Sequence, residues 1–305
     1  MRASRLFETP PIGGPDGQEP FLNAVAAFET TATAREILQL LQQIELRLGR
    51  QRRQRWDARS IDLDVVLHGE LVGGGTGLIV PHPRYTARQF VLQPACDVAP
   101  HYRDPRFGWT LQRLAQHLCE GVASIALVGG DVATRNEICQ RLGEEHGIQT
   151  FAARPLSEPM SVVGNAPAPI RANPLQHNVD RQAPRCRLDV QPDDVQPDSG
   201  LNDDVQMVVL DRQQPWVSAF APPLPALASG ETSQSNIPRL IARMQLATPE
   251  TRWPAPHQMW PAGWRWPEYR LEVDDLGWAV SEVASALASM RCPVKPVTED
   301  GSWAD

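Results

Sequence analysis

The residues most suited to chemistry are an acidic pair that directly follows a run of arginines. Residues 50–59 contain five arginines, at positions 50, 52, 53, 55 and 59. Guanidinium forks grip phosphate oxygens two at a time. Asp62 and Asp64 follow, and in an extended strand their side chains project to the same side. Two carboxylates on one face suit Mg²⁺, which takes oxygen ligands and retains waters and substrate phosphates. The combination predicts a site for a polyphosphate–magnesium complex.

Each half of this pattern also has a simpler explanation when it is taken alone. The acidic pair is compatible with a solvated strand face that is ion-paired to the arginines, and the arginine run with a basic solvent-exposed loop. The arginine run also raises the alternative of RNA binding, which would show as salt-dependent affinity. The adjacent acidic pair and a net charge of −7 argue against that alternative.

Two further groups of residues flank the acidic pair. Downstream, His82 lies between two prolines, and Arg88 follows it. A lone histidine of this kind is also compatible with a capped loop residue. Upstream lie Phe21 and Asn23. Phe21 is either a core residue or a flat face for a heteroaromatic ring whose edge Asn23 would read.

The first 120 residues are expected to alternate strands and helices. An apolar stretch predicts a strand over 21–29. Thr33 and Glu36 form a capping box, and apolar residues at helical spacing predict a helix over 34–49 that ends at Gly49. Alternation of aspartate with apolar residues predicts a strand over 61–67.

The remainder predicts a second α/β unit. A strand over 124–128 runs into Gly129-Gly130-Asp131 and a helix over 134–146. Residues 153–204 are rich in Pro, Asp, Gln and Asn, so we expect a disordered insert. Strands over 205–210 and 240–246 should follow, and then a helix over 276–290.

Composition limits the class of protein. The 305 residues suggest two domains, the 29 prolines lie mostly after residue 150, and no apolar run approaches a membrane span. The N-terminus lacks the apolar segment of a secretory signal. The five cysteines show neither disulfide nor zinc spacing, which favours reduced thiols in the cytoplasm.

Several sequence blocks in the first part of the chain resemble those of a known family. The blocks E-T-P-P-I-G-G-P-D, R-W-D-A-R-S-I-D-L-D-V-V-L and P-H-P-R are similar to those of the 6-hydroxymethyl-7,8-dihydropterin pyrophosphokinases of folate biosynthesis, in order, over about residues 4–115. The resemblance implies a ferredoxin-like α+β domain and a monomer. It implies transfer of the β,γ-diphosphate of ATP to the hydroxymethyl oxygen of the pterin, with release of AMP.

The resemblance also implies roles for individual residues. Asp62 and Asp64 would hold two Mg²⁺ ions, and Glu45 would contact the adenine side. The catalytic and phosphate-binding residues, which would line the phosphates, are Arg50, Arg52, Arg55, Arg59, His82 and Arg88. The pterin would be sandwiched by two rings and bound by their neighbours, namely Phe21, Phe90, Asn23, Thr9 and Pro10. Trp56 would lie on a mobile loop that closes over the ligands.

Two features do not follow from the resemblance to the pyrophosphokinases: the start of the chain and a glycine-rich motif in the second unit. The first strand, turn and helix of the family should precede Ser4, so an inactive ligand-binding or scaffolding relative is the alternative function. The stretch from Gly129 resembles a P-loop kinase motif, but Thr134, Arg135 and Asn136 replace its second glycine, lysine and hydroxyl residue. We therefore expect a pterin pyrophosphokinase domain over 1–120 and a degenerate P-loop-like α/β domain over 121–152 and 205–305, with the disordered insert at 153–204. An active nucleoside kinase is disfavoured by the absent lysine.

Overall fold

The computed structural model describes residues 1–14, 17–49, 61–75, 77–151, 214–219, 238–246 and 266–304. Residues 1–155 and 211–305 belong to one compact unit. The arginine run, the predicted insert and the predicted strand over 205–210 lie outside the described residues.

Short antiparallel strands form the N-terminal part. β1 (Arg2–Ala3) pairs with β4 (Ala26–Ala27), and β2 (Phe7–Thr9) pairs with β3 (Phe21–Asn23). The predicted strand over 21–29 is therefore interrupted between β3 and β4. At the break, Val25 donates its backbone N–H to the Ser4 hydroxyl at 2.9 Å and accepts from the Ser4 N–H at 2.9 Å. This exchange satisfies the backbone where the ladder stops.

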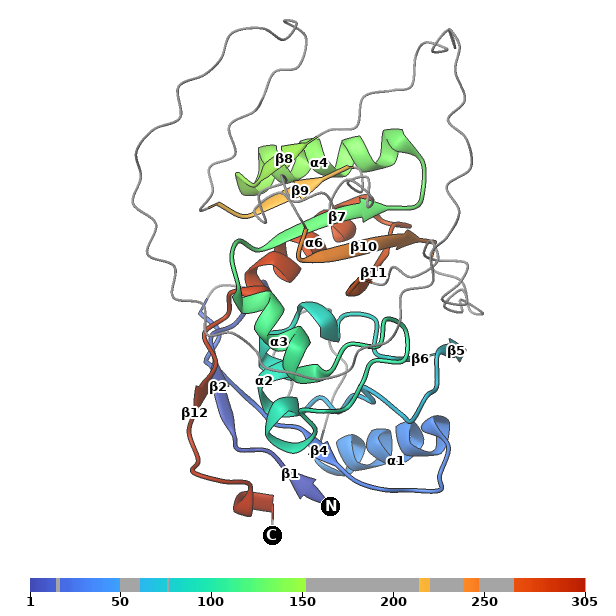
Figure 1. The fold of residues 1–305 in the computed structure, drawn as a ribbon, viewed down its shortest axis with the longest axis vertical. Coiled ribbons are helices and arrows are strands. Elements are labelled where there is room, and N and C mark those ends of the chain that lie inside the picture. Colours follow the sequence, from blue (N-terminus) through green and yellow to red (C-terminus); the bar gives the residue numbers. More distant parts are fainter. Residues whose placement is uncertain are drawn as a thin grey trace, which may run out of the picture. The chain divides into compact units, whose positions relative to one another are not determined.

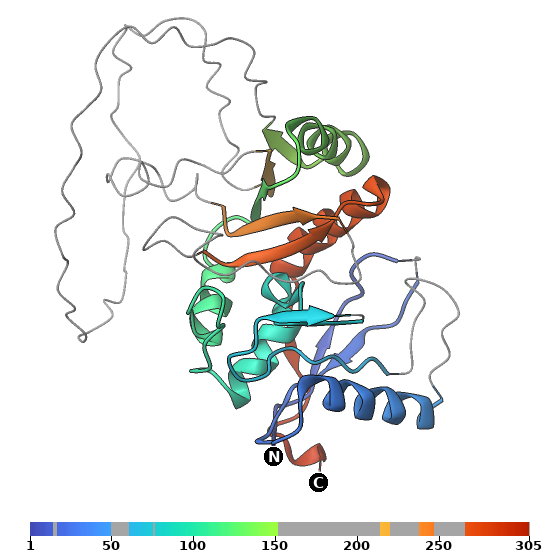
Figure 2. The ribbon, with the colours of Figure 1, turned by 90° about the vertical axis from the view of Figure 1, so that its right-hand side faces the viewer.

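The C-terminal segment extends the same sheet. β12 (Lys295–Pro296) pairs antiparallel with β2, and Val297 N–H donates to the Leu6 carbonyl at 2.9 Å. The Trp303 indole, in the 3₁₀ turn η4 (Ser302–Ala304), donates to the Ser4 carbonyl at 2.7 Å. The two marked termini accordingly lie near each other in Figure 2.

Helix α1 (Ala34–Arg47) confirms the predicted helix and its cap. The Thr33 hydroxyl accepts from the Glu36 N–H, and the Glu36 carboxylate accepts from the Thr33 N–H at 2.7 Å. The helix ends at Leu48, and Gly49 follows with φ +79°. That backbone conformation favours glycine, which explains the stop.

The prediction of a strand over 61–67 is wrong. These residues pair with no strand among the described residues, although Ile61, Leu63 and Val65 are more buried than Asp62 and Asp64. The expected alternation of faces is therefore present without a ladder. Apolar alternation describes an extended backbone, but a strand also requires a neighbouring backbone to pair with.

A hairpin and two helices lead to the second half. β5 (Gly73–Gly75) and β6 (Leu78–Val80) form the hairpin, and the 3₁₀ turn η1 (Tyr85–Ala87) precedes α2 (Gln89–Val98). Helix α3 (Leu111–Cys119) packs on α2.

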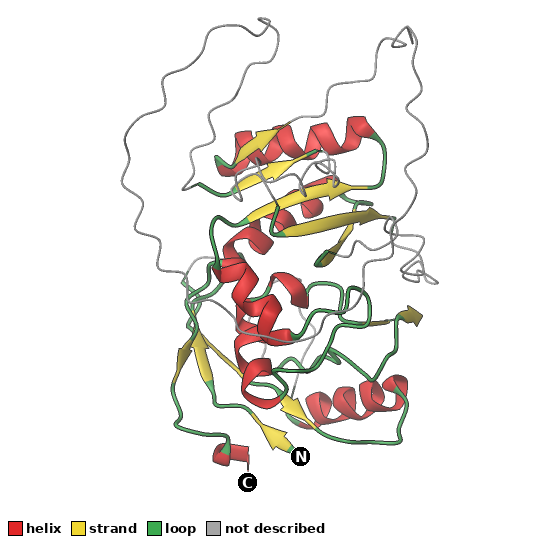
Figure 3. Ribbon diagram, viewed as in Figure 1, coloured by secondary structure: helices red, strands yellow, loops and turns green. Residues whose placement is uncertain are grey.

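The second half is built on a parallel sheet, coloured yellow in Figure 3. Its strands are β7 (Ser124–Val128), β8 (Gln149–Phe151), β9 (Trp216–Ser218), β10 (Leu240–Gln245) and β11 (Glu268–Glu272). The order β11-β10-β7-β9-β8 places β7 in the centre (Figure 1). Helices α4 (Val132–His146) and α6 (Leu276–Met290) pack against each other and against this sheet. The predicted strands over 124–128 and 240–246 and the predicted helices over 134–146 and 276–290 are confirmed to within two residues at each end.

One apolar core joins the two halves. It contains Leu92 from α2, Leu114 from α3, Leu127 from β7 and Val283 from α6, all buried. The domain boundary expected near residue 120 stays a prediction, although the described residues on either side of it share this core. No helix within the described ranges has the length and apolar character that a membrane crossing requires.

Candidate active site

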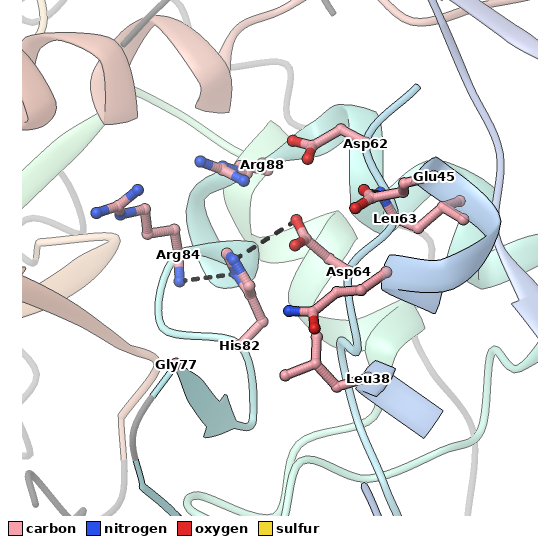
Figure 4. A pocket seen from close by; sticks show the side chains of 10 residues that line it. Leu38, Glu45, Asp62, Leu63, Asp64, Gly77, His82, Arg84 and Arg88 are labelled. Carbon is pink, nitrogen blue, oxygen red and sulfur yellow. Dashed lines mark hydrogen bonds and ion pairs between the residues drawn. The ribbon is translucent and has the colours of Figure 1, made fainter. Parts of the chain in front are cut away.

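A polar cavity of about 260 Å³ collects residues from several separate elements (Figure 4). Its lining comprises Leu38, Gln42, Glu45, Asp62, Leu63, Asp64, Gly77, His82, Arg84 and Arg88. The structure thus brings together five of the predicted site residues. These are Glu45 from α1, the acidic pair from the extended segment, His82 from the turn after β6, and Arg88 at the start of α2.

Glu45 positions the acidic pair. Glu45 is only 3% exposed, and its carboxylate accepts the Leu63 backbone N–H at 2.7 Å. That bond fixes the peptide between Asp62 and Asp64, so both carboxylates lie on the side of the segment that faces the cavity (Figure 4). Residues 61–67 have no strand partner in the described part of the chain, and this side-chain bond supplies one of the fixed points of the segment. The adenine-side role of Glu45 stays a prediction.

His82 faces Asp64. Its Nε2 lies 3.7 Å from an Asp64 carboxylate oxygen, and its Nδ1 accepts the Arg84 backbone N–H at 3.2 Å. Burial lowers the pKa of His82 well below its usual value, and the charges of Arg88, Arg84 and Arg106 lower it further. A neutral ring with that hydrogen bond at Nδ1 carries its proton on Nε2. His82 is therefore a neutral hydrogen-bond donor directed at the carboxylate side of the cavity.

Two arginines complete the basic side. Arg88 is the residue directly before α2, and its guanidinium lies over the Phe90 ring, 5.6 Å from the ring centroid. The Arg84 Nε lies 3.2 Å from the Glu282 carboxylate of α6. Figure 4 shows the Arg84 side chain extending away from Asp62 and Asp64.

The donors at the acidic pair fit a hard divalent cation. Asp64 has a side chain that is 49% exposed, and the carboxylates of Asp62 and Asp64 both line the cavity. The described residues contain no cluster of three or more potential protein ligands. Mg²⁺ is commonly held by one or two carboxylates, with substrate phosphates and water as the other ligands. The pair therefore suits a cation that arrives with a polyphosphate better than a closed metal site.

The predicted pterin residues lie outside the lining of this cavity. Thr9 on β2 is buried and accepts a hydrogen bond from the Asn23 amide of β3 at 2.9 Å. Phe21 is 38% exposed, which rules out the core interpretation and leaves its ring accessible. Pro10 is exposed, and Phe90 is partly buried on α2. Contacts between α2 and the strands β2 and β3 place these residues on neighbouring elements.

Several predicted residues are not described. Arg50, Arg52, Arg55, Trp56 and Arg59 lie in the undescribed range 50–60.

Sequence reasoning missed two of the polar residues that line the cavity, Gln42 and Arg84. Gln42 lies three residues before Glu45 on α1, so its position on the same helical face was a readable signal. Arg84 follows His82 by two residues but was given no role. Its partner, Glu282, is 198 residues away, and no local pattern marks that pairing.

The turn Gly129–Asp131 after β7 differs from the cavity in how its charged groups are used. The Arg135 guanidinium donates to the carbonyls of Gly129 at 2.6 Å, Gly130 at 2.9 Å and Ala219 at 2.8 Å. Asp131 caps α4 and accepts the Thr134 N–H at 2.8 Å. The Arg135 guanidinium is thus hydrogen-bonded to the carbonyls of the turn. The Asp131 carboxylate lies at the N-terminus of α4, where an anion would otherwise bind.

Comparison with known proteins agrees with the location of the cavity. Residues 1–100 match the family model described as 7,8-dihydro-6-hydroxymethylpterin-pyrophosphokinase. This range contains every described residue of the cavity lining and ends before β7.

The chain is also similar to individual proteins that bear a name of this kind. The chain is 44% identical over 105 residues to the 2-amino-4-hydroxy-6-hydroxymethyldihydropteridine pyrophosphokinase of Pseudomonas aeruginosa, an alignment that covers 34% of this chain and 64% of the relative. The protein of the same name from Bacillus subtilis is 42% identical over 97 residues, covering 32% and 58%. That from Synechocystis sp. is 32% identical over 126 residues, covering 41% and 64%. The chain thus spans less than two thirds of the length of each of these relatives.

Proposed function

We propose that this chain transfers diphosphate from ATP to 6-hydroxymethyl-7,8-dihydropterin and releases AMP, as in folate biosynthesis. One observation carries the proposal. Glu45, Asp62, Asp64, His82 and Arg88, which are separate in the sequence, converge on one polar cavity within the residues that match the family. The names of the relatives support the choice of substrate and reaction.

The reaction requires positioning and charge neutralisation. The hydroxymethyl oxygen of the pterin forms a bond to the β-phosphorus and loses its proton to solvent. The bond from that phosphorus to the oxygen bridging the α-phosphate breaks, and AMP keeps that oxygen. Arg88 and the Nε2–H of His82 supply charge and a hydrogen bond to the phosphate oxygens, where negative charge accumulates.

Asp62 and Asp64 would hold Mg²⁺, two ions in this proposal. When bound, the metal neutralises phosphate charge. The part of this chain's own residues is to present the carboxylates together, and Glu45 does so through Leu63 N–H. Arg50, Arg52, Arg55 and Arg59 would add cations from the neighbouring loop.

The pterin would bind beside the paired strands β2 and β3. Asn23 and Thr9, already joined by a hydrogen bond, offer polar atoms to the ring edge. Phe21 presents an accessible ring and Phe90 a second one, with Pro10 at the end of β2. An α+β arrangement of the ferredoxin-like kind, a monomeric state and a cytoplasmic location belong to the same proposal.

For the second half we propose a degenerate P-loop-like unit with a structural role. A central parallel strand followed by a glycine turn and a helix supports the likeness. Arg135 and Asp131 occupy the positions that phosphate would need, which supports a structural rather than a catalytic role.

The test is a product assay with ATP, Mg²⁺ and 6-hydroxymethyl-7,8-dihydropterin. The expected products are AMP and the pterin diphosphate, in equal amounts. Asp62→Asn is the matched loss-of-metal variant, and Asp131→Asn, which changes the glycine turn, is the control. Formation of ADP, or equal AMP release by wild type and Asp62→Asn, would contradict the proposal.

A further inference from the structure

We infer that helix α6 supports the proposed nucleotide site from outside its lining, and that Glu282 of α6 is a positioning residue, which holds the turn that presents His82 to Asp64. This inference rests on the proposed function, because it concerns the same cavity. It assigns a role in the proposed function to Glu282, which lies outside residues 1–100, the range that matches the family.

The turn after β6 is docked on the second half by its backbone. Arg270 of β11 donates its N–H to the Pro83 carbonyl at 3.0 Å. The buried Thr86 hydroxyl donates to the Glu268 carbonyl at 2.8 Å. Both sides of Arg84 are therefore attached to β11, so the turn moves with the second half and not only with the first.

The Arg84 side chain is attached to α6. Its guanidinium lies 3.2 Å from the Glu282 carboxylate and stacks 4.8 Å from the centroid of the Trp278 ring. The Glu282 side chain is 6% exposed, that of Arg84 is 28% exposed, and Glu282 also accepts a hydrogen bond from the Tyr269 hydroxyl. A buried carboxylate of this kind needs its cation, because removing one partner leaves a charge without compensation.

Arg84 connects this anchor to His82. The side chain is held by α6, while the backbone N–H of the same residue donates to His82 Nδ1. That hydrogen bond leaves the proton on Nε2, which faces Asp64 at 3.7 Å. Glu282 therefore acts on the site through Arg84 and does not need to touch the nucleotide.

A second set of contacts also holds the turn, so we expect the loss of the Glu282 charge to affect the turn only in part. On its other side the turn is held by Tyr85, whose hydroxyl donates to the buried Asp104, and Asp104 is paired with Arg106. Loss of the Glu282 charge should therefore loosen the turn without unfolding it.

The experiment compares Glu282→Gln with wild type. Glutamine keeps the shape and can still accept from Tyr269, but it removes the charge that holds Arg84. We expect the KM for MgATP to rise about three- to tenfold, the size of one charged contact, with kcat changed less than about twofold. In the ligand-free protein at fixed pH, ¹⁵N resonances of the His82 ring should move away from those of the Nε2–H form. The matched control is Glu145→Gln, which breaks an exposed Arg141–Glu145 pair on α4 and should change neither readout.

A second pair of variants covers the case in which Glu282→Gln does not fold. Arg84→Lys keeps the charge and should give effects between those of wild type and Arg84→Met. The inference is overturned if Arg84→Met, together with Glu282→Gln where that variant folds, leaves both the His82 resonances and the affinity for α,β-methylene ATP unchanged. Both measurements are independent of turnover. Failure of the proposed function would instead show as a wild-type protein that releases no AMP.

Discussion

The cavity beside Asp64 and the turn at Gly129–Asp131 both carry residue patterns associated with phosphate, but their charged groups are arranged differently. In the cavity, acidic side chains from one segment face His82 and Arg88 from another, across a space that a ligand can enter. In the turn, the cation donates directly to the carbonyls of its own loop. The difference shows that a phosphate site requires charged groups held apart by other elements, and that residue types alone do not define one.

The supports of the two regions explain this difference. Glu45 holds the acidic segment through Leu63, and Glu282 of α6 is paired with Arg84, so these two supports of the cavity lie outside the acidic pair. At the turn, Arg135 and Asp131 are themselves the structural anchors, bonding to Ala219 and Thr134. Substitutions in the cavity, in the turn and at the start of α1 test this contrast, and a change of pH tests the core that joins the two halves.

Asp64→Ala should have the largest effect. It removes half of the carboxylate pair proposed to hold Mg²⁺, so we expect turnover to fall by about 10³-fold or more, corresponding to several kcal/mol of transition-state stabilisation. AMP release measures this loss. Asp131→Ala provides the comparison and should retain AMP release within about twofold. Near-normal turnover by Asp64→Ala would remove the metal role from this position.

Lowering the pH tests whether the two halves unfold together. His117 of α3 bonds the Arg239 carbonyl at 3.0 Å and packs edge-on against Trp109 and Trp266. Burial lowers its pKa to about 4.

Because the unfolded histidine titrates near its usual value of about 6.5, the unfolded state binds the proton first as the pH falls. The stability associated with a neutral His117 is therefore present above about pH 6.5 and is lost between there and about pH 4, by up to about 3 kcal/mol. Chemical denaturation as a function of pH should show this slope, and His117→Gln should flatten it. Separate transitions for the two halves, with the slope in only one, would contradict a shared core.

Arg135→Ala should weaken the fold without affecting the reaction. The change removes charged hydrogen bonds to carbonyls in a partly buried turn, so we expect a loss of about 2 kcal/mol of unfolding free energy. At temperatures where the variant is folded, kcat and the KM for MgATP should equal those of wild type. A raised KM with unchanged stability would show that the turn contributes to nucleotide binding after all.

Thr33→Ala should have the smallest effect. It removes the capping hydroxyl of α1 and should cost about 1 kcal/mol of unfolding free energy. Since α1 also carries Glu45, the variant tests how firmly the acidic segment depends on that helix. We expect an unchanged kcat; a large fall in kcat would mean that fraying of the first turn reaches the site.

The helices were readable from the sequence because their signals are local. Thr33 and Glu36 mark the start of α1, and the apolar stripe with Val280 and Val283 marks α6. The convergence of Asp62, Asp64, His82 and Arg88 was also expected, through the resemblance to a family.

What the sequence did not reveal depends on distant partners. Residues 61–67 show the alternation of a strand, yet they lie outside any described ladder, because pairing is decided by other segments. Two contacts join segments that are far apart in the sequence. Arg84 and Glu282 are almost 200 residues apart, and the paired strands β2 and β12 are further apart still. A single sequence contains no periodic signal for such contacts.

The most direct test of the contrast is a crystal structure with Mg²⁺ and α,β-methylene ATP, whose α–β linkage cannot be cleaved in the proposed reaction. We expect density for the β- and γ-phosphates between the Asp62–Asp64 pair and the side chains of His82 and Arg88. Density for the triphosphate at the Gly129–Asp131 turn, with Arg135 displaced from its carbonyls, would contradict this expectation.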